Sequence, residues 1–311
     1  MDGSTPADAL EQLSLLAAKS GAEAEHLFAS LGTRRTLETA ARAGLDREKI
    51  IALPSAGWAD PAGWRSMLRL RTLQPTHVHA WGITALVAAC TGMRRPVGRV
   101  ATFSEPVKWG HRRVLRVVEQ TAGAGKWQWT ALSGCGAREL VAMGMEPARV
   151  TALPAAVSLA GAGAPAEGIL ALKRSLGIGP ADGPVILLAG EGRRSRHDLG
   201  LWGVAILQQL YPRTRVMVRE DSRGREDVGL ERFRHVMPDE ATLLMAPAER
   251  PWRELVHAAD LLLATPDGAM GSASVLAAMA AGVPVLTTPE PCMTELIGHG
   301  ETGLVARTAQ P

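Results

Sequence analysis

The stretch of sequence that decides the fold runs from residue 259 to residue 305 and contains three segments: Ala259-Asp-Leu-Leu-Leu-Ala-Thr-Pro266, Ala278-Met-Ala-Ala-Gly-Val-Pro-Val285 and Gly300-Glu-Thr-Gly-Leu-Val305. An apolar run of strand length covers residues 260–265 and ends at Pro266. A helix is predicted to follow, because Gly282 and then Pro284 give the usual signal for a helix end. Residues 283–287 are predicted to form the next strand. The stretch therefore predicts a strand, a helix and a second, parallel strand.

The predicted helix opens on four small residues, Gly271, Ser272, Ala273 and Ser274. Small side chains leave the N–H groups of the first turn accessible, and the positive end of the helix dipole attracts anions there. Doubly wound sheets bind phosphorylated ligands at such helix starts, next to the carboxyl ends of parallel strands. The sequence therefore predicts an anion site at residues 271–274.

A basic segment follows the apolar strand predicted at residues 185–189. It reads Gly190-Glu-Gly-Arg-Arg-Ser-Arg-His-Asp198, with arginines at 193, 194 and 196. Guanidinium forks match phosphate oxygens, and their charge stabilises a departing nucleoside diphosphate. Two interpretations stay open, a diphosphate site and a solvated basic loop before a helix. We favour the diphosphate site, because both segments are expected at strand ends of one doubly wound sheet.

The rest of the chain repeats the alternation of strand and helix in two series. Strands are predicted at residues 26–31, 50–53, 76–80, 97–103, 128–132 and 150–153, and then at 185–189, 214–218, 241–245, 260–265 and 283–287. A Gly/Ala/Pro linker at residues 161–165 separates the two series. We therefore expect an α/β protein with two domains, residues 1–160 and 166–311, each a parallel sheet with helices on both faces.

The composition is that of a packed soluble protein, with 311 residues, 46% hydrophobic residues, 21% charged residues and a net charge of +3. The mild charge, one Tyr and three Phe argue against a nucleic-acid platform. The three cysteines are far apart and form no Cys-x-x-Cys pair, so neither a disulfide framework nor a metal site is expected. The N-terminus does not read as a signal peptide, and no apolar run approaches the roughly 18 residues of a membrane span. We expect a cytoplasmic protein that binds no nucleic acid, and peripheral membrane contact stays open.

The segments at residues 259–305 resemble the donor-binding region of the group-1 (family 4) retaining glycosyltransferases, which have the GT-B fold. The match is nearly letter for letter over residues 278–285, and residues 73–82 and 131–154 resemble segments of the family's N-terminal domain. The resemblance implies two doubly wound, Rossmann-like domains facing a cleft, with the acceptor side in the N-terminal domain and the donor side in the C-terminal one. It implies transfer of a hexose-like sugar from a nucleotide-diphosphate sugar to an acceptor with retention of configuration. No metal and no cofactor is implied, and the acceptor, whether a sugar, a lipid-linked molecule or a protein, stays open.

The chain departs from the family at two positions. The family carries two glutamates, of which the first contacts the donor sugar and the second holds the nucleotide ribose. These positions fall on Ala269 and Ala277, and the nearest carboxylate to the first is that of Asp267. The family clamps the donor diphosphate with an Arg and a Lys, and the residues that would take these roles here are Arg193 or Arg194, together with Arg196.

Three further side chains are candidates on weaker grounds. Glu295 stands at the family's Pro-Glu position, and ligand contact and capping of a helix start are both open for it. The family's acceptor-domain histidine has no counterpart near Thr102, which leaves Glu105 and His79 as candidate acids or bases. A surface glutamate and a structural histidine are the alternatives.

Residues 1–311 are expected to lack two parts of the family pattern, the first strand with its Gly-rich loop and the C-terminal helices that cross back to the first domain. Together with Ala269 and Ala277, this favours an alternative function, that of a catalytically inactive paralogue with a binding or regulatory role. A third possibility is an epimerase-like enzyme acting on a sugar nucleotide. It would need acid and base carboxylates, for which only Asp267 and Glu105 can be nominated.

Overall fold

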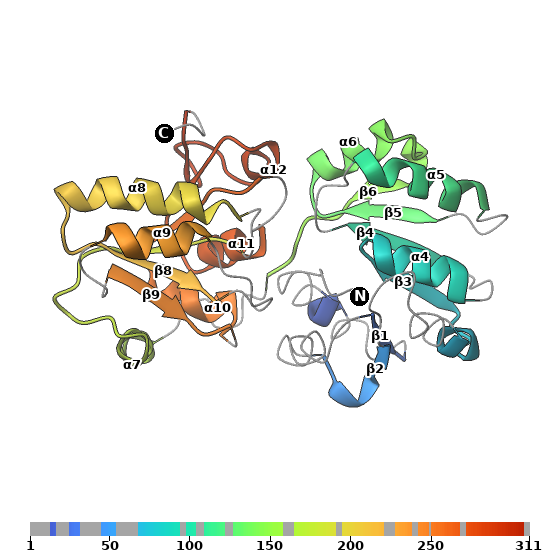
Figure 1. The fold of residues 1–311 in the computed structure, drawn as a ribbon, viewed down its shortest axis with the longest axis horizontal. Coiled ribbons are helices and arrows are strands. Elements are labelled where there is room, and N and C mark those ends of the chain that lie inside the picture. Colours follow the sequence, from blue (N-terminus) through green and yellow to red (C-terminus); the bar gives the residue numbers. More distant parts are fainter. Residues whose placement is uncertain are drawn as a thin grey trace. The chain divides into compact units, whose positions relative to one another are not determined.

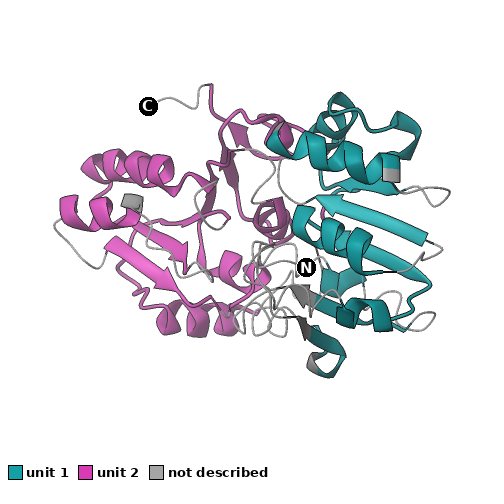
Figure 2. Ribbon diagram, turned by 45° about the vertical axis from the view of Figure 1, so that its right-hand side comes forward, with its two compact units in different colours: residues 1–154 teal, residues 155–311 magenta. Residues whose placement is uncertain are grey.

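The computed structural model describes residues 13–16, 25–31, 45–53, 68–93, 98–103, 109–121, 127–157, 165–190, 195–220, 228–237, 242–248, 250–267 and 272–307 (Figure 1). The chain divides into two compact units, residues 1–154 and residues 155–311 (Figure 2). The predicted linker at 161–165 lies outside the described residues except for Pro165.

The described strands of the first unit form two parallel sheets. Strands β1 (Phe28–Leu31) and β2 (Ile50–Leu53) pair with each other. The other sheet has the order β3-β4-β5-β6, with β3 at His77–Trp81, β4 at Gly98–Phe103, β5 at Gln128–Ala131 and β6 at Val150–Ala152. The connecting helices are α4 (Ile83–Gly92), α5 (Arg112–Thr121) and α6 (Gly134–Ala142). Each of these strands lies within two residues of the predicted one.

Apolar side chains from all three helices meet one face of the four-stranded sheet. Leu86 of α4, Leu115 of α5 and Leu140 of α6 are fully buried in one cluster with Trp127 and Trp129. Burial of a side chain of this size contributes about 1.5–3 kcal/mol. The tryptophans near β5 therefore belong to the core of the first unit.

The second unit holds a six-stranded parallel sheet in the order β12-β11-β10-β7-β8-β9. Its strands are β7 (Val185–Leu188), β8 (Arg215–Arg219), β9 (Leu243–Ala246), β10 (Leu261–Ala264), β11 (Val285–Thr287) and β12 (Leu304–Val305). Its helices are α7 (Ala166–Ser175), α8 (His197–Leu210), α9 (Val228–Val236), α10 (Trp252–Leu255) with the 3₁₀ turn η6 (Val256–Ala258), α11 (Ser272–Ala280) and α12 (Pro291–Thr294).

The chain starts this sheet at its middle and builds it in two directions. It runs from β7 outward through β8 to β9, then returns to β10 on the other side of β7 and continues through β11 to β12. Right-handed crossovers then place the helices of the two halves on opposite faces. In Figure 1, α8 and α9 lie on one side of β8 and β9, and α7 lies on the other. The second unit is therefore doubly wound.

Four elements of this unit were not predicted from the sequence: α7, α9, α12 and β12. Helix α7 follows Pro165 directly, so its start is hidden behind a Gly/Ala/Pro-rich stretch. Helix α12 and strand β12 are only four and two residues long, which is too short to show a period. Such short elements are stabilised by their neighbours rather than by their own sequence pattern.

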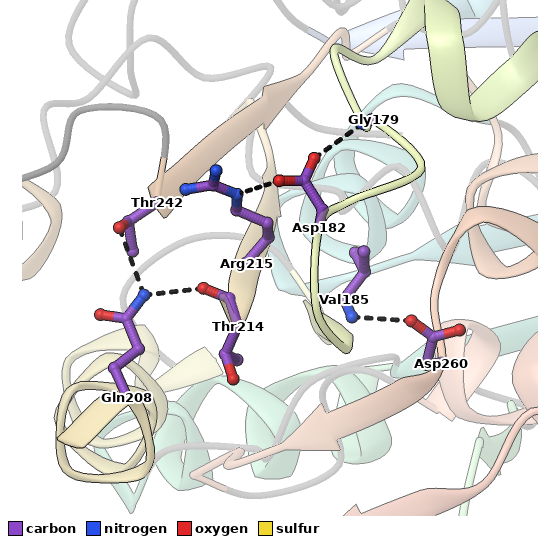
Figure 3. A network of polar contacts seen from close by, with 8 residues as sticks. All are labelled: Gly179, Asp182, Val185, Gln208, Thr214, Arg215, Thr242 and Asp260. Carbon is purple, nitrogen blue, oxygen red and sulfur yellow. Dashed lines mark hydrogen bonds and ion pairs between the residues drawn. The ribbon is translucent and has the colours of Figure 1, made fainter. Parts of the chain in front are cut away.

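Polar side chains close the amino edge of the sheet, where its strands begin (Figure 3). The carboxylate of Asp182 accepts hydrogen bonds from Arg215 Nε at 2.8 Å and from the Gly179 N–H at 2.7 Å. Asp260, which directly precedes β10, accepts from the N–H of Val185 at 2.8 Å. Gln208, near the end of α8, donates to the Thr214 carbonyl at 2.7 Å and to Thr242 Oγ1 at 3.2 Å. These contacts fasten the strand starts to one another.

Candidate functional site

The candidate site lies at the carboxyl edge of the second unit's sheet, where the chain order reverses. Strands β7 and β10 are neighbours there, with Leu188 opposite Leu263, and the ladder continues as the Ala189 N–H donates to the Leu263 carbonyl at 2.9 Å. Helix α8 follows β7 and helix α11 follows β10 on the opposite face. Crevices that accept ligands in open α/β sheets form at such switch points.

The start of α8 is bound to the end of β7 through His197. This first helical residue is buried, and its Nε2 lies 3.1 Å from the carbonyl oxygen of Ala189. Because a carbonyl only accepts, this contact requires the tautomer with a proton on Nε2. Gly200, one turn further, lets the helix approach the sheet, since a Cβ there would lie 3.0 Å from a methyl carbon of Leu188. The helix start is therefore held at a fixed place on the sheet edge.

Arg196 occupies the N-cap position of α8 in the left-handed region, with φ of 48° and ψ of 44°. It is the only described non-glycine residue with a positive φ, a conformation that costs a residue with a Cβ about 1–2 kcal/mol. Its guanidinium is exposed and lies 3.3 Å from the carboxylate of Asp198. Backbone strain of this kind is found at ligand sites, where the surrounding structure imposes it.

The strained backbone is held by Thr265, the residue after β10. Its Oγ1 lies 2.9 Å from the carbonyl oxygens of both Ser195 and Arg196. Thr265 and Ser195 are buried, and Ser195 Oγ has no hydrogen-bond partner within the described residues. Thr265 and His197 were not predicted as site residues. The sequence signal that was available is a polar residue directly after a buried strand and a histidine at a helix start.

The start of α11 supplies the second helix terminus of this edge. Ser272 is half-buried, whereas the side chains of Ala273 and Ser274 are buried. Only the backbone of Ala273 and Ser274, not their side chains, therefore suits the predicted anion site. Ala277, which stands where the resemblance places the ribose glutamate, is 4% exposed. Asp267, two residues after Thr265, is exposed.

The prediction for Glu295 as the cap of a helix start is wrong. Glu295 is the C-cap residue of α12, with helical backbone angles, so it lies at the end of that helix. A carboxylate at a helix end faces the negative end of the dipole, so the explanation as a helix-start cap does not apply. Its alternative, a contact with the donor, stays a prediction.

Several predicted site residues lie outside the described residues: Glu105, Arg193, Arg194, Ala269 and Gly271. Of the predicted diphosphate ligands, the structure therefore places Arg196 and the α11 residues from Ser272 onward. Arg196 and this helix start belong to segments that follow neighbouring strands. Among the residues that the structure describes, no group of three or more His, Cys, Asp or Glu side chains could hold a metal ion, and no helix is long and apolar enough to cross a membrane.

His79, the candidate in the first unit, contacts the neighbouring strand. Its Nε2 lies 2.6 Å from Oγ1 of Thr102 on β4, and its ring lies 5.2 Å from that of Trp81. The residue is in part exposed, and desolvation of its buried part lowers the pKa of the imidazole from 6.5 to about 4. The imidazole is therefore neutral at pH 7 and a weaker base than an ordinary histidine.

Comparison with protein-family models and with curated proteins gives no match to this sequence. Solved structures of similar fold do exist. Anabaena HepE in complex with UDP-glucose superimposes with a TM-score of 0.73 at 16% identity, over 96% of this chain and 82% of HepE. A glycosyltransferase from Rickettsia africae superimposes with a TM-score of 0.71 at 12% identity, over 100% of this chain and 83% of that protein. The UDP-GlcNAc 2-epimerase from Methanocaldococcus jannaschii superimposes with a TM-score of 0.58 at 13% identity, over 99% of this chain and 88% of the epimerase.

These similarities extend over both units of the chain. At identities this low, a shared structure establishes the fold, whereas function depends on the residues of the site. The expected fold class is confirmed, because both units are α/β and are built on parallel sheets. The chain has the GT-B fold of the glycosyltransferases to which it is similar.

Proposed function

We propose that the protein is a glycosyltransferase of the GT-B type whose second unit binds the diphosphate of a nucleotide-sugar donor at the carboxyl edge of β7 and β10. The observation that supports this most is the pairing of two helix starts at the switch point, with the strained Arg196 at one of them. Helix starts bind anions through backbone N–H groups, and a guanidinium adds charge-assisted hydrogen bonds. A diphosphate presents the oxygens and the charge that this combination recognises.

The proposed reaction breaks the bond between the sugar and the diphosphate and transfers the sugar to an acceptor hydroxyl with retention. The leaving diphosphate gains negative charge, which Arg196 and the two helix dipoles would stabilise, with Arg193 or Arg194 as further proposed ligands. This arrangement needs no metal to neutralise the diphosphate. On the acceptor side, neutral His79 is the candidate base for the hydroxyl proton, and Glu105 is the alternative.

A second candidate function is that of a nucleotide-binding protein without turnover. It is favoured by Ala277, a buried residue of α11 that offers no carboxylate to a ribose. Asp267, which is exposed and follows the end of β10 by three residues, would then be the remaining carboxylate near the donor. The two candidates share a donor site and differ in whether bound donor is consumed.

Thermal unfolding in the presence of UDP, GDP, ADP, their sugar conjugates and plain phosphate tests the donor site. A ligand at about 100 times its dissociation constant should stabilise the protein by about 2.7 kcal/mol. A rise in Tm with one nucleoside diphosphate, and a larger rise with its sugar conjugate, would support the site and name the donor. If none of these ligands raises Tm, the proposed donor site is wrong.

Turnover then separates the two candidates. Slow hydrolysis of the stabilising donor, followed as release of nucleoside diphosphate, marks a transferase that uses water when its acceptor is absent. No release at saturating donor, with acceptor sugars and lipid extracts supplied, favours the binding protein. Ala277→Glu gives a second readout. An increase in donor affinity would show that the ribose pocket persists, whereas a stability loss of a few kcal/mol without any gain would show that the pocket is filled.

A further inference from the structure

The outer face of α8, formed by Trp202, Gly203, Ile206 and Leu210, is apolar although it is exposed. The three large side chains follow one another at intervals of four residues, which places them in one row along the helix, and they are 56%, 55% and 75% exposed. The adjoining Tyr211 is 57% exposed. No charged residue occurs from 199 to 212, whereas a helix that faces water normally carries charged side chains on its outer face. The outer face of α8 therefore has the composition of an interface.

Gly203 leaves a gap beside this row of side chains. It is exposed, and a Cβ added to it would meet no described atom within 4 Å. Gly200 in the same helix is explained by its approach to Leu188, but the described neighbours give no such reason for Gly203. A glycine inside a helix costs about 0.5–1 kcal/mol relative to alanine. A gap next to projecting side chains can receive a side chain from a second helix, as in knobs-into-holes packing.

The two ends of the outer face carry opposite charges. Asp198, one turn before Trp202, is exposed, and so is Arg213, three residues after Leu210. An anionic membrane would attract the arginine and repel the aspartate. A protein surface with the opposite order of charges would satisfy both, and such complementarity selects a partner and fixes its orientation. The same face of a second copy, turned end for end, has that order.

We propose that the outer face of α8 is a homodimer interface in which α8 packs antiparallel against α8 of a second copy. Asp198 and Arg213 stand eight residues before and seven residues after Ile206, so the face is nearly symmetric about Ile206. A two-fold axis at Ile206 pairs each residue with its counterpart twice. Trp202 then lies opposite Leu210 of the second copy, and Asp198 lies near Arg213 of the second copy. Dimerisation through this face needs no bound donor, so it is testable apart from the proposed function.

Sedimentation of the full chain over a range of concentrations measures the dissociation constant of the dimer. Ile206→Glu should raise it at least about tenfold, because the two carboxylates meet at the axis and like charges in an interface are costly. The matched control is Leu170→Glu, since Leu170 of α7 is 53% exposed and α7 lies on the other side of the sheet (Figure 1). This control should leave the dissociation constant unchanged. Both replaced side chains are more than half exposed, so both variants should keep the Tm of the wild type.

A charge exchange tests the antiparallel arrangement. Arg213→Asp places like charges near Asp198 of the second copy and should weaken the dimer about two- to tenfold. The double variant Asp198→Arg with Arg213→Asp reverses both charges and should restore most of the affinity. Because the two residues stand at opposite ends of α8, such a restoration cannot arise inside one chain. A double variant that dimerises no better than Arg213→Asp would overturn the antiparallel arrangement.

Two further outcomes would overturn the interface itself. One is a wild-type chain that stays monomeric up to about 1 mM, and the other is a dimer that Ile206→Glu leaves intact. Co-sedimentation with vesicles of phosphatidylglycerol and phosphatidylcholine identifies the rival occupant. A monomeric wild type that binds these vesicles, with binding lost in Ile206→Glu and kept in Leu170→Glu, would assign the outer face of α8 to a membrane surface and refute the dimer.

Discussion

The two edges of the sheet in the second unit use polar residues in opposite ways. At the amino edge, the largely buried Asp182 accepts from Arg215 and Gly179, and the more exposed Asp260 accepts from the backbone of Val185 (Figure 3). At the carboxyl edge, the exposed guanidinium of Arg196 sits on a strained backbone that Thr265 holds. The six strands thus begin at an edge where polar groups join neighbouring strand starts, and they end at an edge where the guanidinium of Arg196 is exposed to solvent.

The two edges differ in where their charged groups lie and not in whether a buried hydroxyl lacks a hydrogen bond. Within the described residues, Thr214 Oγ1 at the amino edge and Ser195 Oγ at the carboxyl edge both have no hydrogen-bond partner. Parallel strands place all helix starts at the carboxyl edge, so the positive ends of the helix dipoles gather there. Stability is therefore expected to depend on the amino edge and anion affinity on the carboxyl edge.

The largest effect is expected from Asp182→Ala at the amino edge. Asp182 and Arg215 are 15% and 17% exposed, and removal of one partner from a largely buried ion pair costs about 2–4 kcal/mol. The free energy of unfolding, measured in urea, should fall by this amount while the affinity for the nucleoside diphosphate stays unchanged. Lys173→Ala is the control, because its pair with Asp260 is more exposed and should contribute less than about 1 kcal/mol. A folded Asp182→Ala protein with weakened ligand binding would contradict the division of roles between the edges.

Arg196→Gly should show the reverse pattern at the carboxyl edge. Loss of charge-assisted hydrogen bonds is expected to reduce the binding free energy of the diphosphate by about 1.5–3 kcal/mol. Stability should stay constant or rise by up to about 1 kcal/mol, because glycine tolerates the left-handed backbone and the ion pair with Asp198 is exposed. Calorimetric binding and urea unfolding of one preparation give both values. An equal loss of stability and affinity would mean that Arg196 is structural.

A smaller effect, below about 1 kcal/mol because solvent screens the exposed side of the ring, is expected from His79 in the first unit. The unfolded chain binds a proton at this residue below its ordinary pKa of 6.5, whereas the folded protein does so only near pH 4. Stability should therefore fall as the pH drops from 6.5 toward 4, and it should rise with pH in that window. Urea unfolding across this range, compared with His79→Gln, isolates the contribution. Identical pH dependence of the two proteins would show that His79 does not titrate with a lowered pKa.

The smallest effect is expected from Asp198→Asn, which sharpens the contrast between the edges. The Asp198 carboxylate lies at the positive start of α8 and within 3.3 Å of the Arg196 guanidinium, so it competes with an incoming phosphate. Its neutralisation should raise diphosphate affinity by about 0.3–1 kcal/mol and lower stability by a similar amount. Weaker binding of Asp198→Asn would mean that the carboxylate organises the site instead of competing with the ligand.

The sequence predicted much of the fold, because most strands are continuous apolar runs that end at turn residues. Val185–Leu188 and Leu261–Ala264 are such runs, and Gly282 with Pro284 marks the end of α11. The start of α7 after Pro165 was missed, because the local composition there resembles that of a linker. Of the site, the sequence indicated Arg196 and the start of α11. It did not indicate Thr265, whose role depends on a contact with residues 69 and 70 positions away.

By itself, then, the sequence determined the elements and their order, since helix and strand periods and stop signals are local properties of the chain. Only the tertiary structure decided that β10 returns beside β7, that Thr265 thereby reaches the Ser195 and Arg196 carbonyls, and that Arg196 adopts a left-handed backbone. It also decided that Glu295 ends α12 instead of starting a helix. The physical reason is the same in each case: strand neighbours are chosen by the packing of the whole sheet, and the hydrogen bonds at its edge exist only once those neighbours are in place.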